Sequence, residues 1–264
     1  MELNLNNKKA IITGASRGIG KAIAVSLAKE GVNLSICSRN LESIKNTAQE
    51  ISSVFGVQVN YSATDTLNTE EVKNFINNSA DFLGGIEIVV NNAAAPGGLV
   101  MGPLETASES DLIQDIDTKV VGYLRVSKYS APYLIKNGWG RIINIGGLAA
   151  RSGGALSGMR NLALTHMTKT LSSELGPKGI NVNIIHPGIT VTEATEPKLT
   201  QQAKDEGVTL QEIETRASQG LDTRKVPTAD DIAVVATFLA SPLSSSIAGE
   251  AIAAGGGVGS AVFM

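Results

Sequence analysis

Short apolar runs alternate with longer amphipathic stretches along the whole chain. The run 86–90 is almost continuous in apolar residues, as expected for a strand whose two faces are both covered. Strands are predicted at 9–13, 33–37, 57–61, 86–90, 141–145, 180–185 and 250–254. Helices are predicted at 21–28, 41–54, 69–82, 108–135, 158–175 and 228–239, with Gly31 ending the first and Thr69 capping the third. This alternation has no domain-sized break, so it predicts a single α/β domain over 1–264, a Rossmann-type doubly wound parallel sheet.

The segment 193–225 departs from this alternation. It is polar and helix-prone, and it is longer than a typical connection between secondary-structure elements. Long inserts of this kind close over ligands when they lie beside a binding crevice. We therefore expect 193–225 to be a substrate lid, although its mixed charges, such as Lys198 and Glu206, indicate no particular substrate.

Composition excludes several classes of protein. The 264 residues are 42% hydrophobic and 18% charged, which excludes a disordered chain, and the single cysteine excludes a disulfide framework. The net charge of −3 argues against a nucleic-acid partner. No apolar run reaches the ~20 residues of a membrane-spanning helix, and the polar start lacks the apolar core of a secretion signal. We expect a cytoplasmic protein with no nucleic-acid or membrane partner, and the spacing of His, Cys and carboxylate residues predicts no metal site.

A glycine-rich turn, 13–20, joins the first predicted strand to the first predicted helix. Such a turn lets a pyrophosphate approach the backbone, and the helix that follows directs free N–H groups and a partial positive charge at it. A turn of small residues without a ligand is the alternative, but the position between strand and helix is the one that dinucleotide binding requires. Cofactor contacts are predicted for Gly14, Ser16, Arg17, Gly18, Ile19 and Gly20.

The end of the second predicted strand indicates which dinucleotide binds. An acidic residue there would accept hydrogen bonds from the adenosine ribose and repel a 2′-phosphate. This chain has Ser38 followed by Arg39, a hydroxyl and a guanidinium that suit a phosphate, and Arg17 in the glycine turn can reach the same group. Two solvated arginines are the alternative. Their joint position without a neighbouring acid predicts NADP(H) as the cofactor.

Further segments resemble motifs of the short-chain dehydrogenase/reductase family. Together with 13–20, the segments 63–66, 91–94, 187–192 and 247–257 match that family from end to end, with Ala94 in place of a glycine. The resemblance implies that Asp65 contacts the adenine, and that the 188–192 backbone and Thr192 hold the nicotinamide carboxamide. The cofactor contacts implied by the resemblance are Asp65, Thr66, Asn92, Ala93, Ala94, Gly188, Ile189 and Thr192.

The catalytic residues of that family do not carry over onto this chain. Counting from Gly122, Lys119 stands at the position of the catalytic asparagine, and 144–147 at the end of the fifth strand holds no hydroxyl for the catalytic serine. The Tyr-x-x-x-Lys pair falls on Ser157 and Asn161. Lys119, Ser157 and Asn161 are therefore the candidate catalytic residues of an altered site.

Lys119 is the candidate whose chemistry fits a reductase best. A carbonyl reductase must deliver a proton to oxygen, and a neighbouring lysine can tune a tyrosine for this but not a serine hydroxyl. Burial would lower the pKa of Lys119 and make it a proton donor. The alternative is a helical ion pair with Asp115, four residues earlier. Loss of acid–base help slows turnover by ~10²–10⁴-fold without forbidding hydride transfer.

Several other residues have a structural interpretation as well as a functional one. Arg160 suits an anionic substrate or a cofactor phosphate, but we favour a solvent or subunit contact. His166 is expected to be packed or interfacial rather than a base. His186, at the end of a strand, can neighbour a nicotinamide, with packing as the more common outcome. Tyr123 and Cys37 are expected in the core.

These observations predict an NADP(H)-binding oxidoreductase for a small carbonyl or alcohol substrate, with atypical catalytic residues. Two alternatives stay open: a cofactor-binding sensor or partner subunit without turnover, and a non-redox enzyme on the same fold, such as one catalysing a cofactor-assisted elimination. The resemblance also implies a homo-oligomer, a tetramer or a dimer, built across the long helices near Tyr123 and His166.

Overall fold

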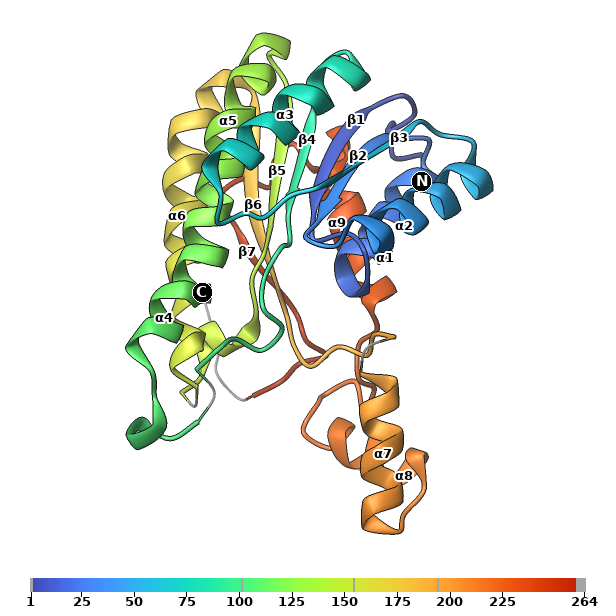
Figure 1. Cartoon of the computed structure of the whole chain (residues 1–264), viewed down its shortest axis with the longest axis vertical. Coiled ribbons are helices and arrows are strands. Elements are labelled where there is room, and N and C mark those ends of the chain that lie inside the picture. Colours follow the sequence, from blue (N-terminus) through green and yellow to red (C-terminus); the bar gives the residue numbers. More distant parts are fainter. Residues whose placement is uncertain (1, 101, 154, 194, 260–264) are drawn as a thin grey trace.

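The chain folds around one parallel sheet whose strand order is β3-β2-β1-β4-β5-β6-β7 (Figure 1). This computed structural model describes residues 2–100, 102–153, 155–193 and 195–259. The strands are β1 Lys9–Thr13, β2 Asn33–Ser38, β3 Val59–Ala63, β4 Ile88–Asn91, β5 Gly140–Ile145, β6 Ile180–Pro187 and β7 Ala251–Ala254. Each strand pairs in parallel with its neighbours, which confirms the predicted doubly wound α/β sheet.

Helices cover both faces of the sheet, as Figure 1 shows. The α-helices are α1 Gly18–Lys29, α2 Leu41–Phe55, α3 Thr69–Leu83, α4 Glu109–Ile116, α5 Gly122–Asn137, α6 Met159–Leu175, α7 Glu196–Glu206, α8 Leu210–Ser218 and α9 Ala229–Ala240. Shorter turns are η1 Leu104–Thr106, η2 Asp117–Val121, η3 Leu148–Arg151, η4 Leu156–Gly158, η5 Gly176–Lys178 and η6 Pro242–Ser244. One layer is formed by α1, α2 and α9, and the other by α3, α5 and α6.

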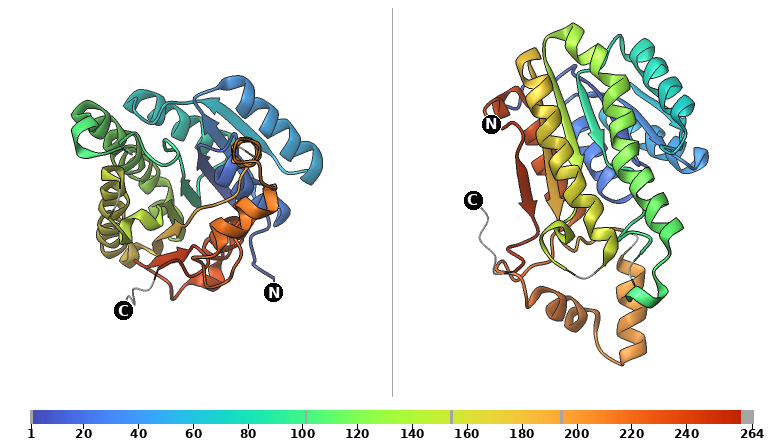
Figure 2. Two further views of the ribbon diagram at one scale, coloured as in Figure 1. Left: turned by 90° about the horizontal axis from the view of Figure 1, so that it is seen from below. Right: turned by 90° about the vertical axis from the view of Figure 1, so that its left-hand side faces the viewer.

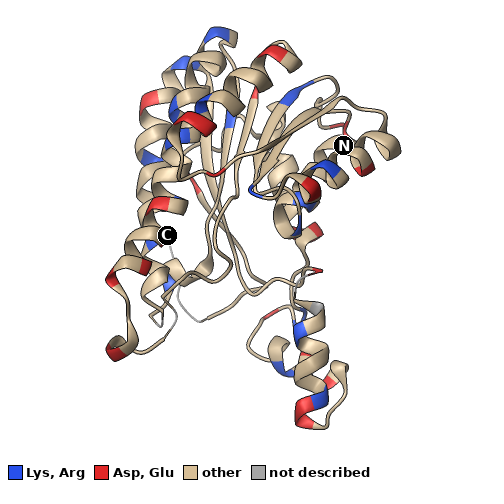
Figure 3. Ribbon diagram, viewed as in Figure 1, with Lys and Arg blue, Asp and Glu red and all other residues tan. Residues whose placement is uncertain are grey.

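The core forms because the central strands are apolar on both faces. In β4, Val90 packs into the layer of α1 and α9, whereas Val89 packs against α3 and α5. Successive side chains of a strand point to opposite faces, so a strand covered on both sides has to be apolar at every position. Charged side chains lie mostly on the helices, with few on the strands (Figure 3).

A buried polar network ties the two middle strands to the helices on one face. The amide of Asn91 donates to Ser127 Oγ at 3.1 Å and to Asn144 Oδ1 at 2.9 Å, and Asn144 donates to Thr168 Oγ1 at 2.9 Å. These bonds link β4 and β5 to α5 and α6 just below the strand ends. The network therefore fixes the positions from which α5 and α6 approach the sheet edge.

Two local expectations were wrong. Asn68, not Thr69, caps α3, because its side chain accepts hydrogen bonds from the backbone of Glu70 and Glu71. The helix expected at 108–135 is interrupted by the π-helical turn η2, Asp117–Val121. Insertions of this kind often occur at functional sites, and Lys119 lies within this one.

The predicted insert 193–225 begins a few residues after β6 and forms the helical arm α7–α8. Figures 1 and 2 show this arm extending beyond the strand ends, away from the rest of the molecule. Residue 194 of the insert, and residues 1 and 260–264 of the predicted domain, lie outside the described residues. Among the described helices, none has the length and apolarity needed to cross a membrane.

Candidate active site

The glycine turn after β1 is built without room for side chains. Gly14 and Gly18 have φ values of +67° and +59°, a region that favours glycine. A Cβ on Gly20 would lie 2.3 Å from the Gly14 carbonyl oxygen and 2.4 Å from Asn92 Nδ2. The turn therefore presents bare backbone at the start of α1, which is the geometry that a pyrophosphate needs.

Asn92 locks this turn to the loop after β4. Its Nδ2 donates to the carbonyls of Thr13 at 3.1 Å and of Gly14 at 2.9 Å. In return, Thr13 Oγ1 accepts from the backbone N–H groups of Asn92 and Ala93 at 3.0 and 3.1 Å. The structure thus brings together two loops that are 78 to 80 residues apart and that both contain predicted cofactor residues.

Glu193 places a carboxylate at the N-terminus of α1, a contact that the sequence did not reveal. Its Oε1 accepts a hydrogen bond from the backbone N–H of Gly18 at 2.6 Å. The positive end of a helix favours an anion at this position. An anion of the chain itself therefore occupies the place where a cofactor phosphate is expected.

The remaining predicted cofactor residues surround the same strand ends. Ser38 donates to the Asn40 carbonyl at 3.0 Å, and Arg17 and Arg39 are exposed and have no ion pair among the described residues. Asp65 Oδ1 caps a turn by accepting from Leu67 N at 3.0 Å. The surroundings of the others differ: half-buried positions for Ser16, Ile19, Ala93, Ala94, Gly188 and Thr192, a buried one for Thr66, and a 73% exposed one for Ile189.

Lys119 reaches the end of β5 from the π-helical turn η2. Its Nζ donates to the Gly146 carbonyl at 2.9 Å and to Asn161 Oδ1 at 2.9 Å, and the residue is only 4% exposed. Burial lowers the pKa of Lys119 to about 7; the positive charge of Arg160 lowers it further, and the negative charge of Asp115 opposes both. The structure therefore joins two of the three catalytic candidates and gives one of them a pKa near neutrality.

Asp115 pairs with Arg160, not with Lys119. The two side chains form a buried ion pair between α4 and α6, and Arg160 Nη2 also donates to the Ala95 carbonyl at 2.9 Å. The Asp115–Lys119 helical ion pair, the alternative to a catalytic Lys119, and the expected solvent or subunit contact of Arg160 were both wrong. Arg160 is only 4% exposed, because its guanidinium extends from α6 to the Asp115 carboxylate on α4.

Ser157 is hydrogen-bonded to the loop after β4. Its Oγ accepts from Val100 N at 2.9 Å, and its own N–H donates to the Val100 carbonyl at 3.3 Å. A Cβ on Gly98 would lie 2.2 Å from the Cβ of Ser157, so the loop backbone packs directly on this residue. Ser157 therefore holds the loop, and a larger side chain at 157 has no space while the loop is in this position.

His186 lies on the other side of the Gly146–Gly147 turn. Its Nδ1 accepts from Gly147 N at 3.0 Å, and its Nε2 lies 2.9 Å from Thr165 Oγ1. Burial lowers the pKa of His186 to about 4, and the positive charge of Arg151 acts in the same direction. The ring is therefore neutral at neutral pH.

Three other residues named from the sequence lie outside this cluster. Tyr123 is buried in the core as expected; its hydroxyl donates to the Ile145 carbonyl at 3.0 Å, and burial raises its pKa. Cys37 is buried, which raises the pKa of its thiol to about 12. His166 is exposed on α6 in the isolated chain. The described residues contain no cluster of His, Cys, Asp and Glu that could hold a metal ion.

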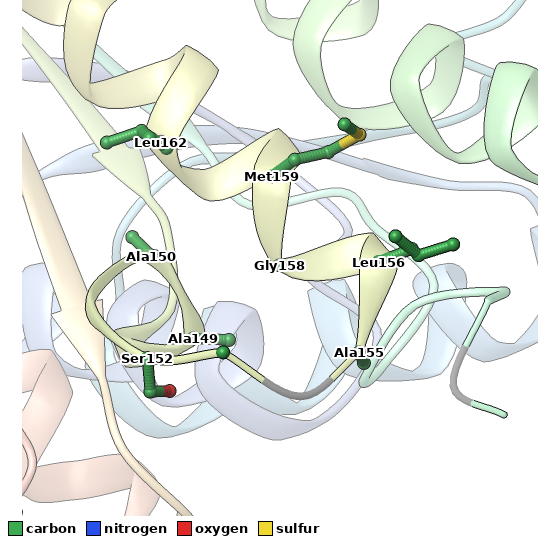
Figure 4. Close-up of a pocket in the computed structure, with 9 residues that line it drawn as sticks. Ala149, Ala150, Ser152, Ala155, Leu156, Gly158, Met159 and Leu162 are labelled. Atoms are coloured by element: carbon green, nitrogen blue, oxygen red, sulfur yellow. The ribbon is translucent and has the colours of Figure 1, made fainter. Parts of the chain in front are cut away.

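A hollow of about 280 Å³ is lined by residues that neighbour Ser157 and Asn161 in the sequence (Figure 4). It lies between the loop that contains η3 and the start of α6, and its walls are mostly apolar. The side chains that shape it include Ala150, Leu156, Met159 and Leu162. An uncharged organic group fits this environment better than an ionic one.

Comparisons with known proteins show that the chain is similar to several reductases. Residues 14–259 match the family model described as "Enoyl-(Acyl carrier protein) reductase". The chain is 30% identical to NADPH-dependent reductase BacG of Bacillus subtilis over 96% of this chain and 98% of BacG. It is 33% identical to 3-oxoacyl-[acyl-carrier-protein] reductase FabG of Chlamydia muridarum over 96% of this chain and 98% of that protein. The structure of L-sorbose reductase from Gluconobacter frateurii, complexed with NADPH and L-sorbose, has a TM-score of 0.91 at 26% identity and covers 98% of both chains.

Proposed function

Because this chain belongs to the short-chain dehydrogenase/reductase family, we propose that it is an NADP(H)-dependent oxidoreductase acting on a small carbonyl or alcohol compound. The observation that carries the proposal is the placement of Lys119, a buried amine with a pKa near 7, at the carboxyl end of β5, where its Nζ donates to the Gly146 carbonyl. This placement supplies an acid–base group where the family resemblance expects the reacting part of the site.

The residues present fit NADP(H). The glycine turn and the N-terminus of α1 would take the pyrophosphate, and Arg17, Ser38 and Arg39 would take the 2′-phosphate. Asp65 would contact the adenine, and the 188–192 segment would hold the nicotinamide. NADP(H), when bound, supplies or accepts the hydride. BacG is named as NADPH-dependent, and the L-sorbose reductase structure contains NADPH, which supports this choice over NAD(H).

Lys119 would hold and move the proton of the reaction. As a neutral amine it has two N–H donors, which the Gly146 carbonyl and Asn161 Oδ1 both accept, and one lone pair. As an ammonium it has a third N–H, and this proton would pass to the substrate oxygen during reduction. The same two hydrogen bonds therefore hold both forms of the amine, so the proton can move without rearrangement of the site.

The catalytic residues are in this proposal atypical for the family. Lys119 takes over acid–base work, Asn161 anchors it, and Gly147 provides no hydroxyl at the strand end. Ser157 takes no part in the chemistry, because its hydroxyl oxygen accepts from Val100 N and its N–H donates to the Val100 carbonyl. It instead keeps the 98–100 loop in place.

A second candidate function is cofactor binding without turnover, as in a sensor or partner subunit. The observation that favours it is the loop at Gly98, whose backbone packs against Ser157 where the family resemblance expects a tyrosine. In this alternative Lys119 has only a structural role. The two functions differ in whether NADPH is consumed.

Assembly and substrate capture are part of the proposal. Apolar side chains are exposed along α4, α5 and α6, among them Ile113, Leu124 and Leu162, and would pack against a second copy in a dimer or tetramer. Tyr123, expected near this interface, is buried and can take no part. The α7–α8 arm would act as the substrate lid. The cytoplasmic location stays a prediction.

Calorimetric titration with NADPH, NADP⁺, NADH and NAD⁺ tests the cofactor part. We expect micromolar, phosphate-selective binding that Arg39→Ala weakens about tenfold or more for NADPH but not for NADH. Lys29→Ala, at the far end of α1, is the matched control. NADPH absorbance with a panel of small ketones and aldehydes then tests turnover. Binding to none of the four nucleotides contradicts both functions, and binding without consumption favours the second.

A further inference from the structure

We propose that His186 is a positioning residue for Lys119, because it holds the Gly146–Gly147 peptide in the orientation that presents the Gly146 carbonyl to the amine. This inference rests on the proposed function, in which Lys119 moves the proton. The His186 ring is hydrogen-bonded to Gly147 and Thr165, and not to Lys119 or to the residues expected to contact the cofactor. It acts through one peptide group.

The two ends of that peptide group are held from opposite sides. Its carbonyl oxygen, on Gly146, accepts from Lys119 Nζ at 2.9 Å. Its N–H, on Gly147, donates to His186 Nδ1 at 3.0 Å. A peptide is planar, so rotation that breaks one of these bonds also misdirects the other. Lys119 and His186 are therefore coupled across a single rigid unit.

The hydrogen bonds fix which ring nitrogen carries the proton. Because Nδ1 accepts from Gly147, the neutral ring carries its proton on Nε2, and Nε2–H donates to Thr165 Oγ1 at 2.9 Å. Thr165 Oγ1 donates in turn to the backbone carbonyl of Asn161 at 3.0 Å. Thr165 thus links the ring to the residue whose side chain is the second anchor of Lys119.

The glycines at this turn are required by the same arrangement. A Cβ on Gly146 would lie 2.4 Å from His186 Nδ1, so the ring packs flush against the peptide. A Cβ on Gly147 would lie 3.0 Å from Asn161 Nδ2. The pair of glycines therefore leaves space for His186 on one side and for Asn161 on the other.

Burial, assisted by the positive charges around the cluster, keeps the His186 ring a hydrogen-bond acceptor while the Lys119 amine titrates. Lys119 is faced by Asp115 from α4 and by Arg160 from α6, and His186 is faced by Arg151 from η3 and by Lys119. The pKa of His186 is about 4, well below that of Lys119 at about 7. Nδ1 therefore accepts from Gly147 over the whole range in which Lys119 gains or loses its proton.

Variants of His186 separate positioning from packing. His186→Leu removes the acceptor, whereas His186→Asn keeps an oxygen near the place of Nδ1, and His166→Asn on the exposed side of α6 is the matched control. We expect His186→Leu to lower kcat about tenfold, a fraction of the full acid–base effect, with the Kd for NADPH within twofold of the unchanged protein. His186→Asn should recover most of this loss.

The pH dependence gives a readout that loss of packing alone would not move. A carbonyl hydrogen bond favours the ammonium form, so its loss in His186→Leu should lower the pKa of Lys119 by about half a unit or more. The shift is measured by NMR titration of ¹³C-labelled lysine side chains, with the Lys119 signal identified by its absence in Lys119→Arg. An unchanged or raised pKa of Lys119 in His186→Leu overturns the inference.

The NMR readout needs no substrate, so the inference and the proposed function can fail separately. If the unchanged protein binds NADPH but consumes none with any carbonyl compound, the proposed function fails while the titration still reports on the Lys119–His186 coupling. If turnover is found and His186→Leu alters neither kcat nor its pH profile, the positioning role is wrong and the reductase proposal stands.

Discussion

The Nζ atom of Lys119 lies 2.9 Å from the Oδ1 atom of Asn161, and this hydrogen bond joins the π-helical turn η2 to α6. The family resemblance places an asparagine at 119 and a lysine at 161. In our proposal the two side-chain types have exchanged helices and remain hydrogen-bonded to each other. The exchange moves the titrating group from α6 to η2 and leaves a neutral amide on α6.

The pH profile of carbonyl reduction should follow the protonation of Lys119. The donor form is the ammonium, and its pKa is about 7 in place of the usual 10.5. We expect kcat for reduction to be level below about pH 6 and to fall tenfold per pH unit well above pH 7. Oxidation of the alcohol needs the neutral amine, so its kcat should rise with pH and level off above about pH 8. Profiles with the same slope in both directions would contradict the assignment.

Breaking the ion pair of Asp115 and Arg160 should destabilise the fold, whereas the fold should tolerate the replacement of both residues together. Asp115→Leu or Arg160→Met alone leaves a buried charge unpaired, which costs about 3–5 kcal/mol in free energy of unfolding. Asp115→Leu combined with Arg160→Met should cost less than the sum of the two single effects. Urea unfolding measures each value. Lys73→Met, at the exposed Glu70–Lys73 pair, is the control and should change the free energy of unfolding far less than either single replacement in the buried pair.

A tyrosine introduced at 157, where the family resemblance expects one, should not by itself supply that family's chemistry. The ring would enter space held by the backbone at Gly98, so Ser157→Tyr should lower the free energy of unfolding by about 1–3 kcal/mol and give no gain in kcat. Ser157→Ala removes only the acceptor for Val100 N and should cost about 1 kcal/mol. A Ser157→Tyr variant that is as stable as the unchanged protein and turns over faster would show that the loop moves aside freely.

Neutralising Glu193 should tighten cofactor binding. Its carboxylate occupies the N–H of Gly18 at the positive end of α1, so a cofactor phosphate must displace it. Charge at a helix end contributes about 0.3–1 kcal/mol, and Glu193→Gln should therefore lower the Kd for NADPH about two- to fivefold. Glu214→Gln, exposed on α8, is the control. An unchanged or weaker affinity in Glu193→Gln would mean that the carboxylate and the phosphate do not compete.

The fold and the bare-backbone turn after β1 were predictable because they depend on local patterns. Apolar runs such as 86–90 identify covered strands, and Gly14, Gly18 and Gly20 identify a turn whose backbone must be bare. Both signals are contained within a few neighbouring residues. They hold wherever the strands finally lie in the sheet.

The contacts that tune the candidate site were not predictable, because they join distant segments. Asp115 lies four residues from Lys119 but pairs with Arg160, 45 residues away, and the π-helical turn that redirects Lys119 has no clear sequence signature. Glu193 reaches Gly18 across 175 residues. The one usable signal was His186 at a strand end, where ligands bind in such sheets, but its partner Gly147 emerged only from the fold.

The most direct test of the account compares Lys119→Met with Lys136→Met, an exposed lysine on α5, in NADPH oxidation by the carbonyl compound that the unchanged protein reduces fastest. We predict that Lys119→Met binds NADPH with a Kd within twofold of the unchanged protein but turns over about 10²-fold more slowly or worse, whereas Lys136→Met is unaffected. A Lys119→Met variant that reduces the carbonyl at the rate of the unchanged protein, with the same pH profile, would contradict the central claim.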